Sequence, residues 1–248
     1  MKILLSNDDG YQATGLRALA NSLKEIAEIL IIAPDRNCSG GSSAITLSAP
    51  LNIERFEKDF YYVNGTPTDC IHLALTGFLD FKPDIIISGI NHGANLGDDV
   101  LYSGTVAAAL EGRLFGIPSI AVSLAYKNGS NFETAISTTI DLINLINNDH
   151  LEKNIILNVN VPDIPKKDIR GIHATRLGRR SKPEPIIGTT NPKGKMLYWI
   201  GKAGGSKDDG EGTDFFSIAN NYISVSPLEV NFTAHNSISS LNNILSKI

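Results

Sequence analysis

The first ten residues, Met1 to Gly10, read MKILLSNDDG and decide the fold. Ile3 to Leu5 form a short apolar run, and polar residues begin at Ser6. Such a run is typical of a buried strand that ends where the polar residues start. A second apolar run, Ile29 to Ile32, also lacks the alternation of a half-exposed strand. Strands that are apolar on both faces are typical of parallel sheets covered by helices.

The segment between these two runs has the spacing of a helix. Thr14 is a candidate N-cap, and apolar residues recur at helical spacing from Leu16 to Ala27, with polar residues on the other face. A strand, helix and strand in this order predict an α/β protein with right-handed crossovers. We therefore expect a doubly wound, mostly parallel sheet in a three-layer α/β/α arrangement.

The chain continues this pattern to about residue 176. Buried strands are expected at 85–87, 120–124 and 155–161, extended and more polar chain at 51–63, and helices at 66–79, 105–115 and 133–146. Beyond that point, many Gly, Pro, Lys and Arg residues interrupt the pattern. We expect one domain over residues 1–248, with a core at about 1–176 and an extended C-terminal hairpin arm and closing segment at about 177–248. Two strand-like segments are expected within 214–228, and a closing helix at 238–248.

The composition is that of an ordinary globular protein. Of the 248 residues, 42% are hydrophobic and 19% are charged, which is enough for a sizeable core. The formal net charge of -4 argues against binding to nucleic acid polymers, which usually needs a basic face. Cys38 and Cys70 lack the spacing of a disulfide framework or a metal site, so a reducing, cytoplasmic compartment is expected. No stretch is long enough to cross a membrane, and no membrane partner is expected.

Asp8 and Asp9 are the strongest functional signal. Ligands of open α/β sheets bind beyond the carboxyl ends of the strands, and both residues directly follow the first strand. Two adjacent carboxylates repel each other unless a cation lies between them, and all-oxygen sites suit Mg²⁺ or Mn²⁺. An Asp-Asp-Gly turn is also typical of a solvated loop, but the position of this one favours a metal site. Ser39 and Asn91, in neighbouring loops, are further candidate ligands.

The segment Tyr102-Ser103-Gly104-Thr105 precedes an alanine-rich helix. Free amides and hydroxyls at a helix N-terminus can hold a phosphate, although a simple helix cap explains the same residues equally well. No Walker sequence is present, which disfavours nucleoside triphosphatase chemistry of that kind. A divalent cation neutralised by two aspartates, with amide donors beside it, suits the hydrolysis of a phosphate monoester.

The other polar residues near these loops are weaker candidates. His92 lies in the expected loop, where an exposed histidine is favoured over a proton donor. Cys38 has no evident histidine partner, so it is not expected to act as a nucleophile. His72 is expected to pack or to lie at the surface of its helix. Asp98 and Asp99 are expected to hydrogen-bond or cap their loop, in preference to forming a second metal site. A solvated or interface patch is favoured over a catalytic clamp for Arg179, Arg180 and Lys182.

Several long motifs follow one another along nearly the whole chain. They are Ser6-Asn7-Asp8-Asp9-Gly10, Ala33-Pro34-Asp35-Arg36-Asn37 with Ser39-Gly40, Gly65-Thr66-Pro67-Thr68-Asp69-Cys70, Ser88-Gly89-Ile90-Asn91, Asn95-Leu96-Gly97-Asp98-Asp99 and Tyr102-Ser103-Gly104-Thr105-Val106. Gly212-Thr213-Asp214-Phe215, Ser226-Pro227-Leu228 and Thr233-Ala234-His235 follow near the C-terminus. Together these motifs resemble the SurE survival-protein family of nucleotidases.

The resemblance implies a Rossmann-like core whose C-terminal arm is exchanged between subunits, giving homodimers or homotetramers. It also implies metal-dependent 5′- and 3′-nucleotidase activity on nucleoside monophosphates, with some exopolyphosphatase activity. One divalent ion per subunit, Mg²⁺ or Mn²⁺, would be held by Asp8, Asp9, Ser39 and Asn91. Asn221 and Asn231 depart from the family pattern, and both positions bear on the arm rather than on the metal.

We expect the cation to polarise the phosphoryl group and to activate a water for in-line attack, with Asp9 favoured over Asp8 to accept the proton. The residues expected to orient the phosphate are Asn95, Ser103, Gly104 and Thr105. Two alternatives stay open: a phosphatase that forms an aspartyl-phosphate on Asp8, and a non-enzymatic, receiver-like Mg²⁺ switch. The first usually needs Asp-x-Asp, whereas the acids here are adjacent. The second needs an acceptor aspartate after a later strand, where Ser88-Gly89 stands instead.

Overall fold

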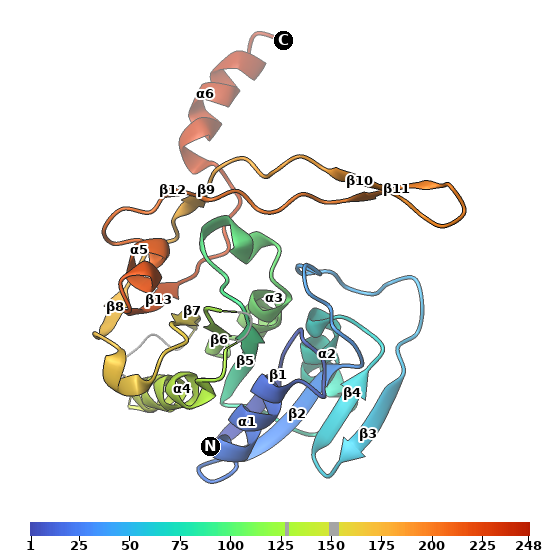
Figure 1. Cartoon of the computed structure of the whole chain (residues 1–248), viewed down its shortest axis with the longest axis vertical. Helices are drawn as coiled ribbons and strands as arrows, with labels where there is room; N and C mark the ends of the chain where they lie inside the picture. Colours follow the sequence, from blue (N-terminus) through green and yellow to red (C-terminus); the bar gives the residue numbers. More distant parts are fainter. Residues whose placement is uncertain (127–128, 149–153) are drawn as a thin grey trace.

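The computed structural model describes residues 1–126, 129–148 and 154–248, and a nine-stranded sheet lies at its centre (Figure 1). The strand order is β3-β4-β2-β1-β5-β6-β7-β13-β8. Their bounds are β1 Lys2–Ser6, β2 Glu28–Pro34, β3 Ile53–Glu57, β4 Phe60–Val63, β5 Ile85–His92, β6 Ser119–Leu124, β7 Ile156–Val161, β8 Ile172–Ala174 and β13 Ile223–Pro227. The pairs β3–β4 and β7–β13 are antiparallel and the other neighbouring pairs are parallel, which confirms the predicted mostly parallel sheet.

Helices cover both faces of the sheet. On one face lie α1 (Thr14–Leu23) and α4 (Phe132–Asn147), and on the other lie α2 (Pro67–Leu73) and α3 (Gly104–Glu111). The side chains of β1 show why both faces need a cover: Ile3 and Leu5 pack in one hydrophobic cluster, while Leu4 packs in another. All three are fully buried. The three-layer arrangement therefore follows from an apolar strand without alternation.

A reciprocal pair of hydrogen bonds caps the N-terminus of α2. The Thr66 side chain accepts a hydrogen bond from the amide of Asp69, and the Asp69 side chain accepts one from the amide of Thr66. This reciprocal pair satisfies two backbone donors that a helix start leaves free. The helix is shorter than predicted, because it passes at Ala74 into a π-helical turn (Ala74–Phe78) that contains Gly77 in a left-handed conformation, with φ of 113°.

Other boundaries also differ from the expectations. The stretch between the strand expected at 85–87 and the helix expected at 105–115 is partly regular, because β5 continues to His92 and a 3-10 helix spans Gly97–Leu101. A second 3-10 turn, Gly112–Phe115, ends the alanine-rich helix, and a third spans Lys166–Asp168. α1 ends at Leu23, four residues earlier than the apolar spacing suggested.

The expectation of two strand-like segments within 214–228 is wrong for the first of them. Residues Asp214–Ala219 form α5, because the Thr213 side chain caps the helix by accepting from the amide of Phe216. The second segment is β13, and it lies inside the central sheet. Asn221, which joins the two, has a φ of 62°, a conformation that asparagine tolerates better than most residues.

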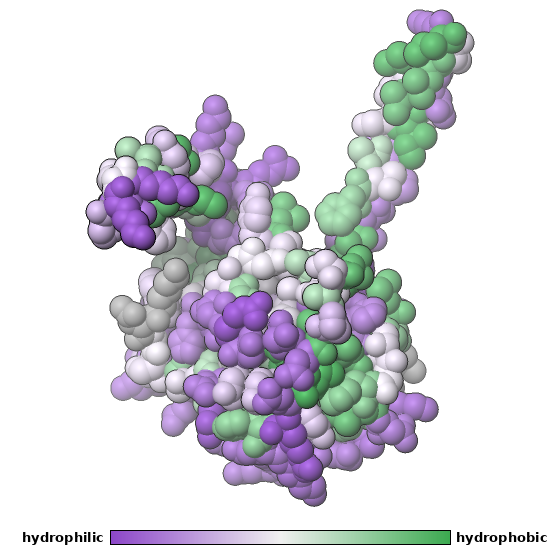
Figure 2. Space-filling model, turned by 90° about the vertical axis from the view of Figure 1, so that its right-hand side faces the viewer, coloured by the Kyte–Doolittle hydropathy of each residue, from purple (hydrophilic) through white to green (hydrophobic). Residues whose placement is uncertain are grey.

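A hairpin arm and a separate helix project from the core (Figures 1 and 2). The arm begins with the antiparallel pair β9 (Arg179–Arg180) and β12 (Ser206–Asp208), and β10 (Ile187–Thr190) and β11 (Met196–Trp199) form its outer part. The C-terminal α6 (His235–Leu245) has no buried residue, so it does not close the core as expected. Since α5 and β13 return to the sheet, the projecting parts are shorter than the predicted segment 177–248. Among the described residues, no helix has the length and apolar character needed to span a membrane.

Gly15 provides a test of the packing between α1 and the sheet. A Cβ atom at this position would lie 2.1 Å from the carbonyl oxygen of Ile90 and 3.2 Å from the ring of Phe132. We predict that Gly15→Ala lowers the free energy of unfolding by roughly 1–3 kcal/mol, as overpacking does, although alanine is the better helix former. Urea denaturation measures this change. Gly205→Ala is the control, because a Cβ there meets no atom within 4 Å. Equal stability of the two variants would contradict the close approach.

Candidate active site

One cavity of about 670 Å³ opens at the carboxyl edge of the sheet, and the three predicted loops line it. It lies where β1 and β5 are neighbours, at the point where the chain order of the strands reverses, which is the usual ligand position in such sheets. Of the residues singled out in the sequence, the cavity brings together Asp8, Asp9, Ser39, Asn91, His92, Asn95, Asp99, Ser103 and Arg180.

Asp8 is buried, with 4% of its surface exposed, and Thr105 of α3 contacts its side chain. The hydroxyl of Thr105 donates to Asp8 Oδ1 at 2.5 Å. Burial raises the pKa of Asp8 and the nearby charge of Asp9 raises it too, while the hydrogen bond from Thr105 opposes them. The close contact needs a glycine at Gly104, because a Cβ there would lie 2.7 Å from the Cβ of Asp8.

Asp9 is held by the end of β5. The backbone amide of His92 donates to Asp9 Oδ2 at 3.1 Å, and the ring nitrogen Nδ1 of His92 lies 3.2 Å from the same oxygen. The ring of His92 also packs edge-on against Phe132, with 5.2 Å between the centroids. The expectation of an exposed loop histidine is therefore wrong: His92 ends a strand, is partly buried and contacts a carboxylate.

The oxygen atoms at this edge fit a small divalent cation. Thr105 uses only one oxygen of Asp8, and Asn91 donates through its amide nitrogen to the carbonyl of Gly93 at 2.8 Å, which leaves its amide oxygen available. Ser39 presents an exposed hydroxyl, while its amide is held by Asn37 Oδ1 at 2.8 Å. No group of three or more His, Cys, Asp or Glu residues suited to a metal occurs among the described residues. Two carboxylates and neutral oxygens are the donor set that Mg²⁺ and Mn²⁺ accept.

Asn95 is fixed by two buried asparagines that the sequence analysis missed. The backbone amide of Asn95 donates to Asn160 Oδ1 at 2.8 Å. Its backbone carbonyl accepts from Asn160 Nδ2 at 3.1 Å and from Asn158 Nδ2 at 2.9 Å. Its own side chain donates to Ser123 Oγ at 2.7 Å. A signal was present, because two asparagines alternate within the otherwise apolar strand at 156–161, and polar side chains buried in a sheet need partners.

The candidate phosphate-binding residues at the start of α3 do not all reach the cavity. Ser103 lines it and caps the helix, since its side chain accepts from the amide of Val106 at 3.1 Å. Thr105 is fully buried and its hydroxyl is used by Asp8. The structure therefore favours Thr105 as a support for Asp8 rather than as a direct contact to a phosphate. Gly104 packs against Asp8 and is buried as well.

Of the two surroundings expected for Arg180, the solvated one is wrong, because its side chain is only 24% exposed. Arg180 lines the cavity and forms two hydrogen bonds with Asp99, at 2.6 Å from Nε and 2.5 Å from Nη2. Asp99 and Asp98 hold their loop as predicted, because Asp99 also accepts from the amide of Leu96, and Asp98 accepts from the amide of Arg180. Away from the cavity, the ring of His72 contacts Glu111 at 2.9 Å.

Known proteins are similar to this chain over nearly its whole length. The family model described as "Survival protein SurE" matches residues 3–184. A Nitrosomonas europaea protein named "5'-nucleotidase SurE" is 52% identical over 245 residues, covering 99% of each chain, and a Methylococcus capsulatus protein of the same name is 54% identical over 241 residues, covering 97% of this chain and 96% of its own. The crystal structure of the SurE protein from Aquifex aeolicus aligns with a TM-score of 0.86 at 40% identity, covering 98% of this chain and 99% of its own. The chain belongs to the SurE family.

Proposed function

We propose that this protein is a divalent-metal-dependent phosphomonoesterase that hydrolyses nucleoside 5′-monophosphates, and also 3′-monophosphates, to nucleoside and phosphate. The observation that carries the proposal is the pair Asp8 and Asp9 in one cavity with Ser39 and Asn91. The names of relatives that share about half of their residues with the chain support the substrate class. Some exopolyphosphatase activity is part of the same proposal.

Asp8, Asp9, Ser39 and Asn91 are the proposed ligands of one Mg²⁺ or Mn²⁺ ion per subunit. The bound ion would supply positive charge that stabilises the phosphoryl oxygens during hydrolysis. The chain's own residues do the rest: Thr105 fixes the orientation of Asp8, and His92 fixes that of Asp9.

The phosphate would bind beside the N-terminus of α3, where Ser103 and Asn95 line the cavity. The positive end of the helix dipole favours an anion there by about 0.3–1 kcal/mol. Asp9 is the proposed acceptor for the proton of the attacking water, because His92 contacts only one of its two oxygens. This position is less buried than that of Asp8, so a water can reach it.

Asp8→Asn tests the carboxylate pair directly. We expect turnover of nucleoside monophosphates to fall roughly a hundredfold or more, since the change removes one of two charges that the cation needs. Metal affinity, measured by calorimetry, should fall as well. Asp35→Asn is the matched control: it removes a carboxylate at the same edge that contacts Arg36 and does not line the cavity. Wild-type turnover and metal affinity in Asp8→Asn would overturn the proposal.

Removal of the metal is a second test. Purified protein is incubated with a panel of nucleoside monophosphates, polyphosphate and other phosphate esters, in Mg²⁺, in Mn²⁺ or with a chelator. We expect phosphate release with a divalent ion, and its loss with the chelator, because the two aspartates alone give an anionic site. Phosphate release that continues at an equal rate in the chelator would contradict the metal-dependent scheme.

Self-association through the arm, as a homodimer or homotetramer, belongs to the same proposal. The outer hairpin exposes a run of large apolar side chains, including Ile186, Leu197, Tyr198, Trp199 and Ile200. Exposed apolar patches of this kind are typical of interfaces between proteins. Figure 2 shows the hairpin and α6 standing away from the core, where a second copy can reach them.

The double variant Tyr198→Lys/Trp199→Lys tests the role of the arm. We expect it to shift the protein from an oligomer to a monomer in size-exclusion chromatography with light scattering, because two charges replace apolar contact area. Ile26→Lys is the control, since Ile26 is an exposed apolar residue outside the arm. A monomeric wild type, or an unchanged oligomer in the double variant, would refute self-association through the hairpin.

A further inference from the structure

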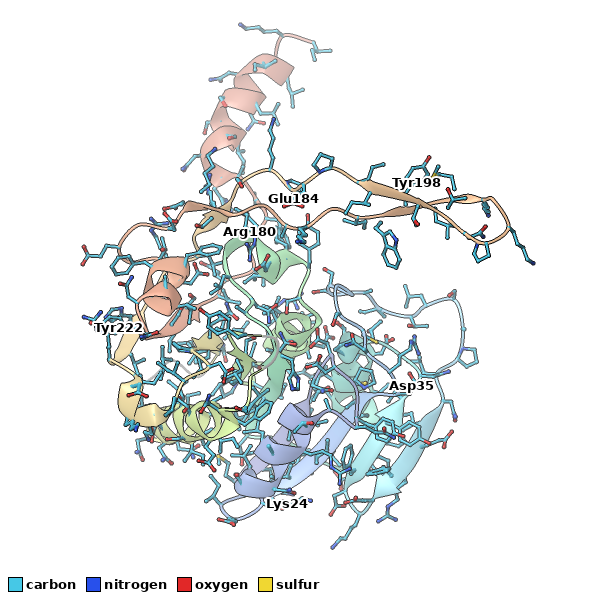
Figure 3. All side chains as sticks on the ribbon, viewed as in Figure 1. Lys24, Asp35, Arg180, Glu184, Tyr198 and Tyr222 are labelled. Atoms are coloured by element: carbon cyan, nitrogen blue, oxygen red, sulfur yellow. The ribbon has the colours of Figure 1, made fainter. Side chains whose placement is uncertain are left out.

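Arg180 lies at the base of the arm and forms part of the cavity wall (Figure 3). Its hydrogen bonds go to Asp99, to Asp98 through its backbone amide, and to the carbonyl of Gly204 at 3.0 Å. None of these partners is a proposed metal ligand. The side chain is 24% exposed, so it is anchored but still reachable from the cavity. The arm therefore contributes a fixed cationic group to a site built mainly by the sheet edge.

The chemistry of this group differs from that of a phosphate clamp. A guanidinium has five N–H donors, and Asp99 and Gly204 take three of them: Nε, one on Nη2 and one on Nη1. Because the bidentate carboxylate of Asp99 neutralises the charge of Arg180, the pair attracts a phosphate dianion weakly. One N–H on each terminal nitrogen is left to donate to neutral acceptors.

Aromatic rings near Arg180 add a second means of recognition. The ring of Phe215 lies 5.2 Å from the guanidinium carbon and packs against it. Arginine planes stack on aromatic groups, a property that lysine lacks. Tyr102 lines the same cavity as Arg180, with 66% of its surface exposed. The backbone amide of Tyr102 donates to the carbonyl of Asp99. This wall thus offers hydrogen-bond donors on Arg180 and the exposed ring of Tyr102, which match the hydroxyls and the base of a nucleoside.

We infer that Arg180 is a substrate-binding residue that contacts the nucleoside part of the substrate, while the sheet edge around Asp8 and Asp9 takes the phosphate. This inference rests on the proposed nucleotidase function and assigns the nucleoside end of the site to the arm. Arg180 thereby selects nucleoside monophosphates over phosphate esters that carry a small organic group.

A second ion pair in the same region provides a matched control. Arg176 binds Asp208 through two hydrogen bonds, at 2.6 Å from Nη1 and 3.0 Å from Nη2. Both pairs tie an arginine near the base of the arm to an aspartate, but Arg176 is not part of the cavity wall. If Arg180 served only to hold the arm in place, loss of the Arg176–Asp208 pair would be expected to have the same effect as loss of the Arg180–Asp99 pair.

The experiment compares the full-length wild type with Arg180→Lys, Arg180→Met and Arg176→Met. Each is assayed with its divalent ion on a nucleoside 5′-monophosphate and on glycerol 2-phosphate. For both Arg180 variants we expect KM for the nucleotide to rise about tenfold, while kcat stays within about threefold. A tenfold rise is equivalent to the loss of one hydrogen bond from a charged donor to the substrate. Values for glycerol 2-phosphate should not change. Arg176→Met should match the wild type on both substrates.

The other outcomes are also decisive. The inference is overturned if the Arg180 variants match the wild type, lose activity on both esters alike, or behave as Arg176→Met does. Arg180→Lys keeps a positive charge opposite Asp99, so it carries the test if Arg180→Met does not fold. A wild type that hydrolyses glycerol 2-phosphate but no nucleoside monophosphate would instead refute the proposed function, a result that the variants do not produce.

Discussion

The fold brings two carboxylates to the tip of a buried central strand and must then hold them there. At a separation of about 4 Å and an effective dielectric constant of about 20, two such charges repel by about 4 kcal/mol. Each is anchored by a different element: Thr105 of α3 donates to Asp8, and His92 at the end of β5 donates to Asp9. These two hydrogen bonds come from a hydroxyl and a backbone amide, which are neutral donors, and a cation is the proposed source of the compensating charge.

Local sequence patterns predict only part of the structure that holds the two aspartates in place. Apolar runs predicted the buried strands, and apolar residues at helical spacing predicted α1, because both patterns act over a few residues. By contrast, β13 was assigned outside the core because its partners β7 and β8 are distant in the sequence. The four proposed metal ligands were selected because each follows an expected apolar strand, although Asn91 itself lies within β5. Arg180 was not, since its partner Asp99 lies 81 residues away.

The arm is joined to the cavity by a buried carboxylate as well as by Arg180. Asp214, at the start of α5, accepts from the amide of Gly97 at 2.7 Å and from the amide of Gly178 at 2.8 Å. Gly97 begins the 3-10 helix that leads to Tyr102 and Ser103, and Gly178 directly precedes the arm. One fully buried side chain thus sets the position of the arm relative to the site. The proposed assembly surface and the proposed substrate-binding surface are therefore anchored by the same side chain.

The central claim is that a divalent ion compensates the repulsion between Asp8 and Asp9. The most direct measurement is a crystal structure of the protein grown with Mn²⁺, in which anomalous scattering locates the ion. The account predicts one peak per chain, bound by both carboxylates together with Ser39 and Asn91. An empty position in millimolar Mn²⁺, with the two carboxylates turned apart into solvent, would contradict it.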